Sequence, residues 1–244
     1  MQQTTTHHGL EWKLPTVTLE ACAWWSLRAW ASFVAWRNVG ITVDGLEHIP
    51  TYGPVILAAR HVHHLYDGCA LLSVVPRPLH LMVALDWARS PWQRWLLESA
   101  TTLARWPGVI RSESFALNPD HQYTVMNQRA RLRRAIQESQ SLLADGRALL
   151  TFPEGYPIVD PWPGPPRNAE RLLPFRRGFV HLARRATREC AVPIPIVPVG
   201  LRYESGSHRH LCLRLGHPEF ATETVNENAL AALVRQRVDE LSRP

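Results

Sequence analysis

Short apolar runs alternate with longer helical patterns along most of this chain. Strand-like runs occupy residues 55–60, 79–83, 107–111, 148–152, 193–202 and 211–215. Helical patterns occupy residues 68–75, 90–103, 119–144, 177–188 and 225–241. Because alternating strands and helices build crossover units, this order predicts an α/β fold with a mixed, mostly parallel central sheet flanked by helices.

Two segments depart from this alternation. Residues 39–50 alternate between apolar and polar side chains and turn at Asp44-Gly45, which predicts a hairpin-like entry into the sheet. Residues 156–166 are dense in proline and tryptophan and resist both helix and strand. We expect them to form a loop over the edge of the sheet that displays polar residues.

The amino-terminal region predicts a helix at the membrane interface. Residues 19–36 read as a helix with four tryptophans, but Glu20 and Arg28 interrupt it and it is shorter than a spanning segment. Tryptophan rings favour the wet boundary of a bilayer, so an in-plane helix fits better. The alternative is a helix packed on the protein's own core. Residues 1–10 lack the basic start and cleavage site of a secretory signal.

Length and cysteine usage limit the domain organisation. A chain of 244 residues with 45% hydrophobic content suits one well-buried domain. We expect a disordered lead-in at residues 1–16, the tryptophan-rich helix at 17–38, one α/β domain at 39–220 and a carboxy-terminal helix at 221–244. The four cysteines have no paired spacing, which favours small buried hydrophobes in a reducing compartment over disulfides or a zinc site. They are Cys22, Cys69, Cys190 and Cys212.

The net charge of +6 comes almost wholly from arginine, because Lys13 is the only lysine. Arginine suits phosphate recognition and anionic membrane surfaces. The arginines are dispersed through apolar helices and no nucleic-acid-binding module is visible, so a nucleic acid partner is not expected. The chain also lacks a Gly-x-Ser-x-Gly elbow and a glycine-rich nucleotide loop. Serine hydrolase chemistry and a nucleotide cofactor are therefore not indicated.

Candidate chemistry stands where apolar strands end. The run from residue 55 leads into His61, His63 and Asp67, and the run from residue 148 ends in Phe152-Pro153-Glu154-Gly155. Between them, residues 107–111 close on a cation, Arg111. Histidine supplies a base near neutral pH, and a carboxylate beside it fixes its tautomer.

The order of these elements resembles the glycerophospholipid acyltransferase family, the 1-acylglycerol-3-phosphate acyltransferases and their relatives, over residues 40–205. Phe152-Pro153-Glu154-Gly155 is its most specific element, and Pro198 marks the family's last, hydrophobic motif. The resemblance implies that His61 is the general base and that Asp67 orients it. It also implies a set of substrate-binding residues, which are Gly108, Arg111, Glu154, Gly155, Arg176 and Arg177.

The histidine motif departs from the family pattern. The family has four residues between histidine and aspartate, whereas five separate His61 from Asp67. Alignment on the preceding strand favours His61 with one extra residue in the turn. His63 is the alternative, because four residues along a helix return a side chain to nearly the same face as Asp67. Arg60 replaces a common asparagine and Tyr156 a common threonine, which suggests a divergent branch.

The resemblance implies transfer of a fatty acyl group from acyl-CoA or acyl-carrier protein to the hydroxyl of a lysophospholipid, with lysophosphatidic acid the first candidate. It implies a membrane-associated enzyme on the cytoplasmic face, with no metal and no cofactor beyond the acyl donor. Trp92 and Trp95 share one side of their helix and line either an acyl-chain groove or ordinary core.

Two other functions compete with this one. The first is a non-catalytic lipid-binding membrane protein in which the extra turn residue disables the base. The second is a metal-dependent hydrolase, because His61-Val62-His63 begins like a His-x-His-x-Asp-His metal motif. Leu65 and Tyr66 stand where that motif requires aspartate and histidine.

Overall fold

The computed structural model describes residues 19–86, 88, 90–111, 123–159, 171–204 and 209–244. The helical elements are α1 (Leu19–Asn38), the 3-10 turn η1 (Leu46–His48), α2 (Tyr66–Val74), α3 (Pro91–Leu103), α5 (Val125–Ala144), α6 (Gly178–Cys190) and α7 (Glu227–Leu241). The strands are β1 (Gly40–Asp44), β2 (Val55–Ala59), β3 (Leu79–Leu81), β4 (Val83–Ala84), β5 (Gly108–Val109), β6 (Ala148–Thr151), β7 (Ile194–Glu204), β8 (His210–Leu215) and β9 (Glu219–Ala221). The predicted lead-in at residues 1–16 and most of the predicted loop at 156–166 lie outside the described residues.

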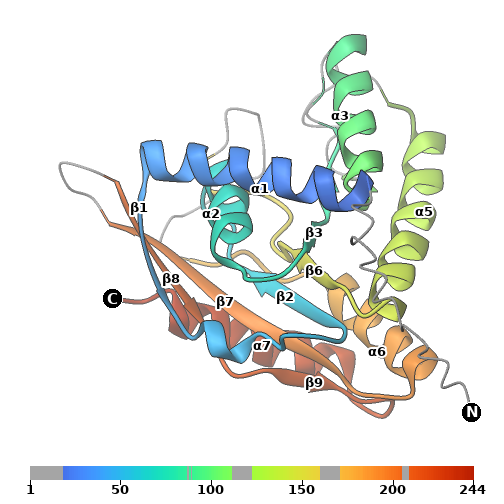
Figure 1. The fold of residues 1–244 in the computed structure, drawn as a ribbon. Helices are drawn as coiled ribbons and strands as arrows, with labels where there is room; N and C mark the ends of the chain where they lie inside the picture. Colours follow the sequence, from blue (N-terminus) through green and yellow to red (C-terminus); the bar gives the residue numbers. More distant parts are fainter. Residues whose placement is uncertain (1–18, 87, 89, 112–122, 160–170, 205–208) are drawn as a thin grey trace, which may run out of the picture.

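The described part of the chain forms a seven-stranded sheet with the order β1-β8-β7-β2-β6-β3, and β9 pairs with β7 (Figure 1). β2 runs parallel to β6 and β7, β3 runs parallel to β6, and β1 runs parallel to β8. Among the described strands, only the pairings of β7 with β8 and with β9 are antiparallel. The predicted mixed, mostly parallel sheet is confirmed. β4 and β5 form a separate parallel pair.

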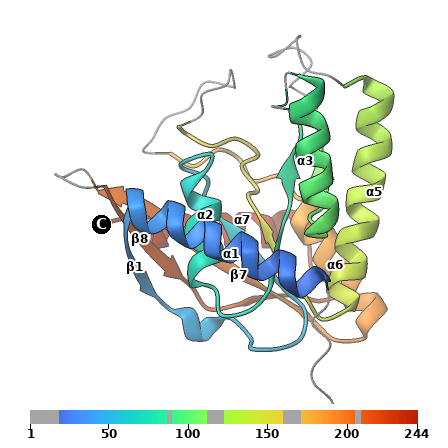
Figure 2. The ribbon, with the colours of Figure 1, turned by 45° about the horizontal axis from the view of Figure 1, so that its top comes forward.

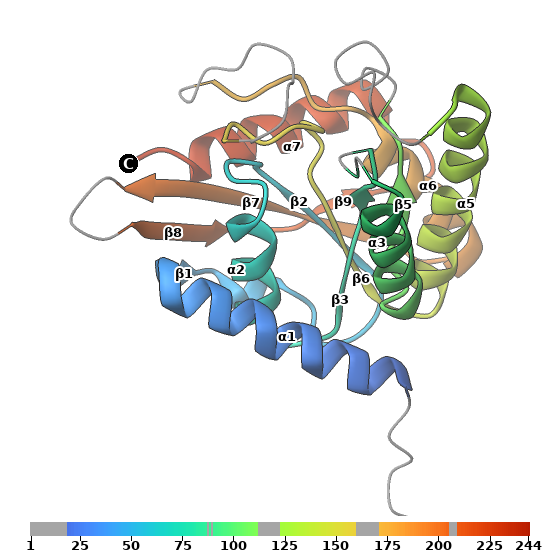
Figure 3. The ribbon, with the colours of Figure 1, turned by 90° about the horizontal axis from the view of Figure 1, so that it is seen from above.

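Helices cover both faces of the sheet. α1 and α2 lie over one face, and α6 and α7 lie over the other, as Figure 3 shows from above. The carboxy-terminal end of α5 joins the second layer through Leu142 and Leu143. β2 is buried at every position because both of its faces are covered. Its residues therefore alternate between two separate hydrophobic cores.

The amino-terminal helix α1 is present and lies across α2 (Figure 2). Its inward face is narrow and built of alanines, with Ala23, Ala31 and Ala35 buried. Its outward face carries large apolar side chains, each more than half exposed. We call this set the α1 stripe: Leu19, Trp25, Trp30, Phe33 and Trp36.

Two charged side chains of α1 turn back toward the protein. Glu20 forms ion pairs with Arg105 and Arg147, at 3.6 and 3.5 Å. Arg28 donates hydrogen bonds to the carbonyl oxygens of Ser73 and Val75 at the end of α2. The exposed face of α1 therefore carries large apolar side chains, unlike that of a usual surface helix, while Glu20 and Arg28 are paired with the protein. None of the helices within the described residues is both long enough and apolar enough to cross a bilayer.

The structure corrects four details of the sequence-based predictions. The hairpin-like entry is wrong: η1 follows β1, which pairs in parallel with β8. Gly45 makes this turn at φ 80°, and a Cβ there would lie 2.2 Å from Leu215 O. The strand predicted at 79–83 divides into β3 and β4, and β9 was not predicted. Core packing of Trp92 and Trp95 is also wrong, because 64% and 69% of their surfaces are exposed.

Candidate active site

The carboxyl ends of β2, β6 and β7 meet at one edge of the sheet. β2 lies between the other two and runs parallel to both. His61 follows β2, and the Phe152 to Gly155 segment follows β6. Because the crevice at the carboxyl ends of parallel strands collects their following residues, these two segments come together. The N–H of His61 donates to Glu154 Oε1 over 2.8 Å and joins them directly.

The imidazole of His61 is hydrogen-bonded to Asp67, with Nδ1 3.0 Å from Oδ2. Asp67 is fully buried in the first turn of α2, where the helix dipole favours a carboxylate. A carboxylate oxygen only accepts hydrogen bonds, so Nδ1 carries the proton and Nε2 is left as the acceptor. His61 keeps 14% of its side chain exposed. The pair therefore offers Nε2 as an acceptor on a partly exposed imidazole, with a carboxylate behind it.

The extra residue of the histidine motif is accommodated in a turn around the carboxylate. Asp67 Oδ2 also accepts the backbone N–H groups of Val62 and His63, at 2.6 and 2.8 Å. The His63 ring does not face Asp67: its Nδ1 accepts the N–H of Leu65 at 3.2 Å, and the ring stacks on Tyr66. Of the two histidines, His61 is thus the one whose side chain meets the carboxylate.

The surroundings of His63 also favour the neutral form of its ring. Burial lowers the pKa of His63 below its ordinary value, and the neighbouring His64 lowers it further. Asp67 acts in the opposite direction but more weakly. The His63 ring is therefore neutral at physiological pH.

Tyr203 is a partner of Asp67 that the sequence did not reveal. Its hydroxyl donates to Asp67 Oδ1 over 2.8 Å. Burial raises the pKa of Tyr203, and the negative charge of Asp67 raises it further, so the hydroxyl remains a donor. Strand alternation in β7 places Tyr203 on the same face as Val199 and Leu201, toward α2. That periodicity is the one signal that links it to Asp67.

Two residues after β6 hold His61 in place. The Phe152 ring stacks on the imidazole with centroids 4.0 Å apart and planes inclined by 16°. Glu154 is buried, and its two oxygens accept the N–H groups of His61 at 2.8 Å and Leu173 at 2.9 Å. Burial raises the pKa of Glu154, although these N–H groups and the charge of Arg60 lower it. In this structure Glu154 fixes backbone at the site.

Arg111 joins the segment of residues 107–111 to the Phe152 to Gly155 segment. Its Nε and Nη2 lie 2.9 and 2.8 Å from Asp86 Oδ2, and its Nη1 donates to Gly155 O at 3.1 Å. The guanidinium also stacks on the Tyr156 ring, 4.2 Å from the centroid. Asp86 was not predicted, although it follows β4 just as Arg111 follows β5, its parallel partner. The pair lies 2% and 11% exposed.

Arg176 approaches the same tyrosine. Its guanidinium lies 5.8 Å from the Tyr156 ring centroid. Gly155 adopts φ 77°, and a Cβ at this position would lie 3.0 Å from Arg176 Nε. Arg111, Gly155 and Arg176 are therefore gathered around Tyr156. Arg177 points elsewhere, because its Nη1 donates to Asn228 Oδ1 on α7 over 2.9 Å.

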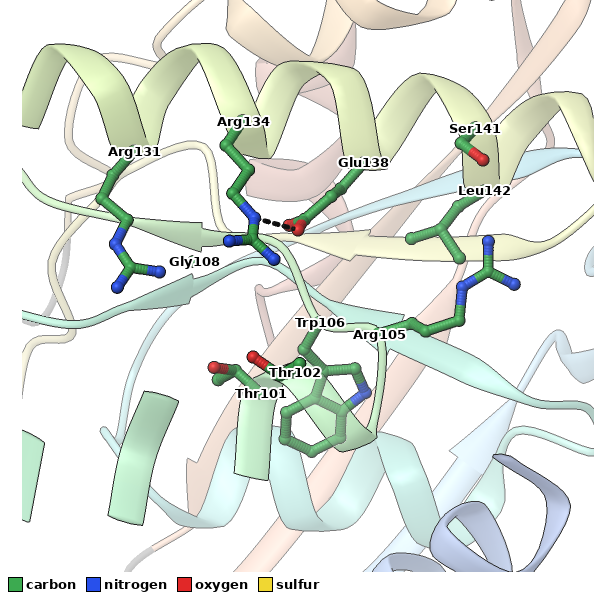
Figure 4. A pocket seen from close by; sticks show the side chains of 10 residues that line it. All are labelled: Thr101, Thr102, Arg105, Trp106, Gly108, Arg131, Arg134, Glu138, Ser141 and Leu142. Atoms are coloured by element: carbon green, nitrogen blue, oxygen red, sulfur yellow. Dashed lines mark hydrogen bonds and ion pairs between the residues drawn. The ribbon is translucent and has the colours of Figure 1, made fainter. Parts of the chain in front are cut away.

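Gly108 lies apart from the other predicted binding residues. It lines a pocket between α3 and α5 together with Arg131 and Arg134 (Figure 4). Their guanidiniums form ion pairs with Glu98 and Glu138, each at 2.7 Å. A Cβ at Gly108 would lie 2.7 Å from Leu85 Cδ1, so close packing accounts for the glycine.

Within the described ranges, three possible metal ligands gather on the β7 and β8 strands: Glu204, His210 and Cys212 lie within 4.8 Å of one another. The Arg202 guanidinium already pairs with two of them: it lies 2.5 Å from Glu204 Oε1 and 3.8 Å from Cys212 Sγ. Because successive strand residues face opposite sides, Glu204 points away from the face that carries Tyr203 and Asp67. This group is separate from the candidate active site.

The family model named Acyltransferase matches residues 40–202. This chain belongs to the Acyltransferase family. The family predicted from the ordered motifs is thereby confirmed, and the chain is an O-acyltransferase and not a metal-dependent hydrolase. A comparison with curated proteins finds no significant match.

The fold of this acyltransferase also has a counterpart among solved structures. It resembles the crystal structure of the 1-acyl-sn-glycerophosphate (LPA) acyltransferase PlsC from Thermotoga maritima, with a TM-score of 0.57 and 18% sequence identity. The similarity covers 89% of this chain and 77% of that one. At this identity the likeness establishes a shared fold.

Proposed function

We propose that this acyltransferase moves a fatty acyl group from a thioester donor, acyl-CoA or acyl-carrier protein, to the hydroxyl of a lysophospholipid. Lysophosphatidic acid is the first candidate acceptor. The His61–Asp67 hydrogen bond is the observation that carries this proposal, because it leaves Nε2 as a base at the edge of the sheet. The PlsC fold supports the same chemistry.

In the proposed reaction, His61 Nε2 accepts the proton of the acceptor hydroxyl. At the same time the oxygen of that hydroxyl forms a bond to the thioester carbonyl carbon. The buried Asp67 carboxylate stabilises the resulting imidazolium. The carbon–sulfur bond then breaks, and the departing sulfur takes the proton back from His61. The ester forms directly, without a covalent acyl-enzyme.

The acceptor phosphate is proposed to bind where Arg111 and Arg176 flank Tyr156. Guanidinium groups offer paired donors that match phosphate oxygens. The ion pair with Asp86 holds Arg111 in position, so the phosphate meets a preorganised cation. Glu154 and Gly155 were predicted to bind substrate, and in this proposal they contribute indirectly. Glu154 holds the backbone of His61, and Gly155 leaves room for the Arg176 side chain.

The α1 stripe supports binding in the plane of a membrane, on the cytoplasmic face where the acyl donors are found. Its aromatic rings are exposed, while Glu20 and Arg28 are engaged on the inner side. Cys22 is exposed on this helix. Once the other three cysteines are replaced, it can be labelled with a dye whose emission reports the polarity of its surroundings. Dye emission should shift to the blue with anionic lipid vesicles, and a triple serine variant of Trp30, Phe33 and Trp36 should abolish the shift.

The decisive experiment is an acceptor panel with radiolabelled acyl-CoA or acyl-carrier protein, on wild type, His61→Ala and His63→Ala. General-base help contributes about 10²- to 10⁴-fold in rate, so His61→Ala should lose that much while His63→Ala keeps most activity. Equal losses in the two variants would contradict the assignment of the base. Lysophospholipid binding without turnover in wild type would favour the non-catalytic lipid-binding alternative.

A further inference from the structure

A pocket of about 400 Å³ lies beneath the amino-terminal half of α1. Its wall includes Leu79 and Arg147, at the starts of β3 and β6. His61 and Glu154 instead follow the ends of β2 and β6, at the opposite edge of the sheet. Among the described residues, none that contributes to the candidate active site lines this pocket, which we call the α1 pocket.

The walls of the α1 pocket are mostly apolar. Aromatic rings come from α1 and from the segment after α3, and prolines come from the turn between α2 and β3. These residues are Trp24, Trp25, Trp106, Pro76 and Pro78. Its volume falls in the range of ligand sites, and an apolar wall with a few polar groups is typical of them.

Two buried polar groups on this wall have no hydrogen-bond partner among the described residues: His80 Nε2 and Trp24 Nε1. His80 is 97% buried, with 3% of its surface exposed. Its Nδ1 faces the carbonyl oxygen of Ala104 at 3.2 Å, so Nδ1 carries the proton and Nε2 is an acceptor. Burial lowers the pKa of His80, which keeps the ring neutral. Glu20, at 4.0 Å from Nε2, is beyond hydrogen-bond distance.

We propose that the α1 pocket binds the hydroxyl end of an alkyl lipid, such as a fatty alcohol or a monoacylglycerol. A hydroxyl donates to His80 Nε2 and accepts from Trp24 Nε1, and the alkyl chain lies against the tryptophan and proline walls. Buried polar groups are nearly always satisfied, so these two indicate a missing partner. A carboxylate fits less well, because it has no proton for Nε2 and lies beside Glu20.

The position of Trp25 suggests how such a lipid enters. Trp25 belongs both to the pocket wall and to the exposed α1 stripe. An apolar phase that covers the stripe therefore continues into the pocket. The lipid site is independent of acyl transfer, so its test needs no catalytic activity.

The test measures binding of 1-decanol, monodecanoylglycerol and decanoate to the full chain by titration calorimetry, with 1-decanol and monodecanoylglycerol separating the two lipid sources. At least one of the two hydroxyl ligands should bind about tenfold more tightly than decanoate. Trp24→Phe and His80→Phe should each weaken that binding about fivefold, since each removes one neutral hydrogen bond. Trp30→Phe, an exposed tryptophan on the same helix, and His61→Ala should leave the affinity unchanged.

Equal weakening by Trp24→Phe and Trp30→Phe would overturn the site and indicate adsorption to the α1 stripe. Equal affinity for decanoate would overturn the hydroxyl assignment, and no binding of either hydroxyl ligand would overturn both. Circular dichroism checks that each variant folds. If His80→Phe does not fold, Ala21→Phe, which fills the pocket from α1, should abolish binding.

Discussion

Tyr203 donates its hydroxyl to Asp67 Oδ1 over 2.8 Å, and so connects the far end of β7 to the first turn of α2. The other oxygen of this carboxylate accepts two backbone N–H groups and His61 Nδ1. The carboxylate is thus held by donors from two separate segments of the chain, residues 61–63 and the end of β7. Such a network fixes the direction in which the imidazole points.

Replacement of Tyr203 by phenylalanine should slow acyl transfer while leaving KM nearly unchanged. A hydrogen bond to a charged group contributes about 1.5–3 kcal/mol, so a loss of roughly tenfold in kcat is expected. The acid limb of the pH–rate profile should move to higher pH, because the charged form of the carboxylate loses a donor. Tyr66→Phe, on α2 beside His63, is the matched control. An unchanged profile would leave Tyr203 with a packing role only.

Glu154→Gln should lower the free energy of unfolding by about 1–3 kcal/mol. The two carboxylate oxygens accept the N–H groups of His61 and Leu173, whereas an amide offers one oxygen and turns its own N–H₂ toward the second donor. Urea denaturation measures the difference. Glu223→Gln, at an exposed position, is the control and should be nearly neutral.

The same carboxyl group predicts a pH dependence of stability. Burial raises the pKa of Glu154 in the folded state, so the folded chain binds this proton more tightly than the unfolded chain. Its contribution to stability should therefore fall as pH rises from about 4.3, the ordinary value, through the raised folded value. Glu154→Gln should lack this component of the slope. An identical slope in wild type and variant would contradict the raised pKa.

The parts of the fold and site that follow from local sequence were predictable. Apolar runs such as residues 55–59 and 148–151 became buried parallel strands, and the polar residues after them met at one edge of the sheet. This follows because the carboxyl ends of parallel neighbours coincide. The alternation of apolar and helical segments was therefore sufficient to place His61 near Glu154.

The parts that depend on long-range register were not predictable. Tyr203 meets Asp67 across 136 positions of sequence, and the alternation of β7 indicates the face on which Tyr203 lies but not its partner. The parallel pairing of β1 with β8 likewise could not be predicted from the turn at Asp44-Gly45. Side-chain use also depends on burial: Glu154 was expected to meet substrate, but its two oxygens bind backbone in this structure.

Arg176 and Arg177 provide a matched pair for the acceptor site. Arg176→Ala should raise KM for a phosphate-bearing acceptor by about ten- to a hundredfold, since it removes a charged hydrogen-bond donor beside Tyr156. Arg177→Ala should leave KM unchanged, because this side chain binds Asn228 on α7. Initial rates against acceptor concentration test both variants. A larger KM effect at Arg177 would place the phosphate elsewhere.

The ion pair of Arg111 with Asp86 separates structural from substrate roles. Arg111→Met alone leaves a carboxylate with 2% exposure without its main countercharge, and should cost about 3–5 kcal/mol in unfolding free energy. Adding Asp86→Asn removes the buried charge and should restore much of this stability. If Arg111 binds the acceptor phosphate, activity should stay low in the stable double variant, with KM for the acceptor raised. Recovery of activity together with stability would show that Arg111 serves only to hold the Gly155 turn against the sheet.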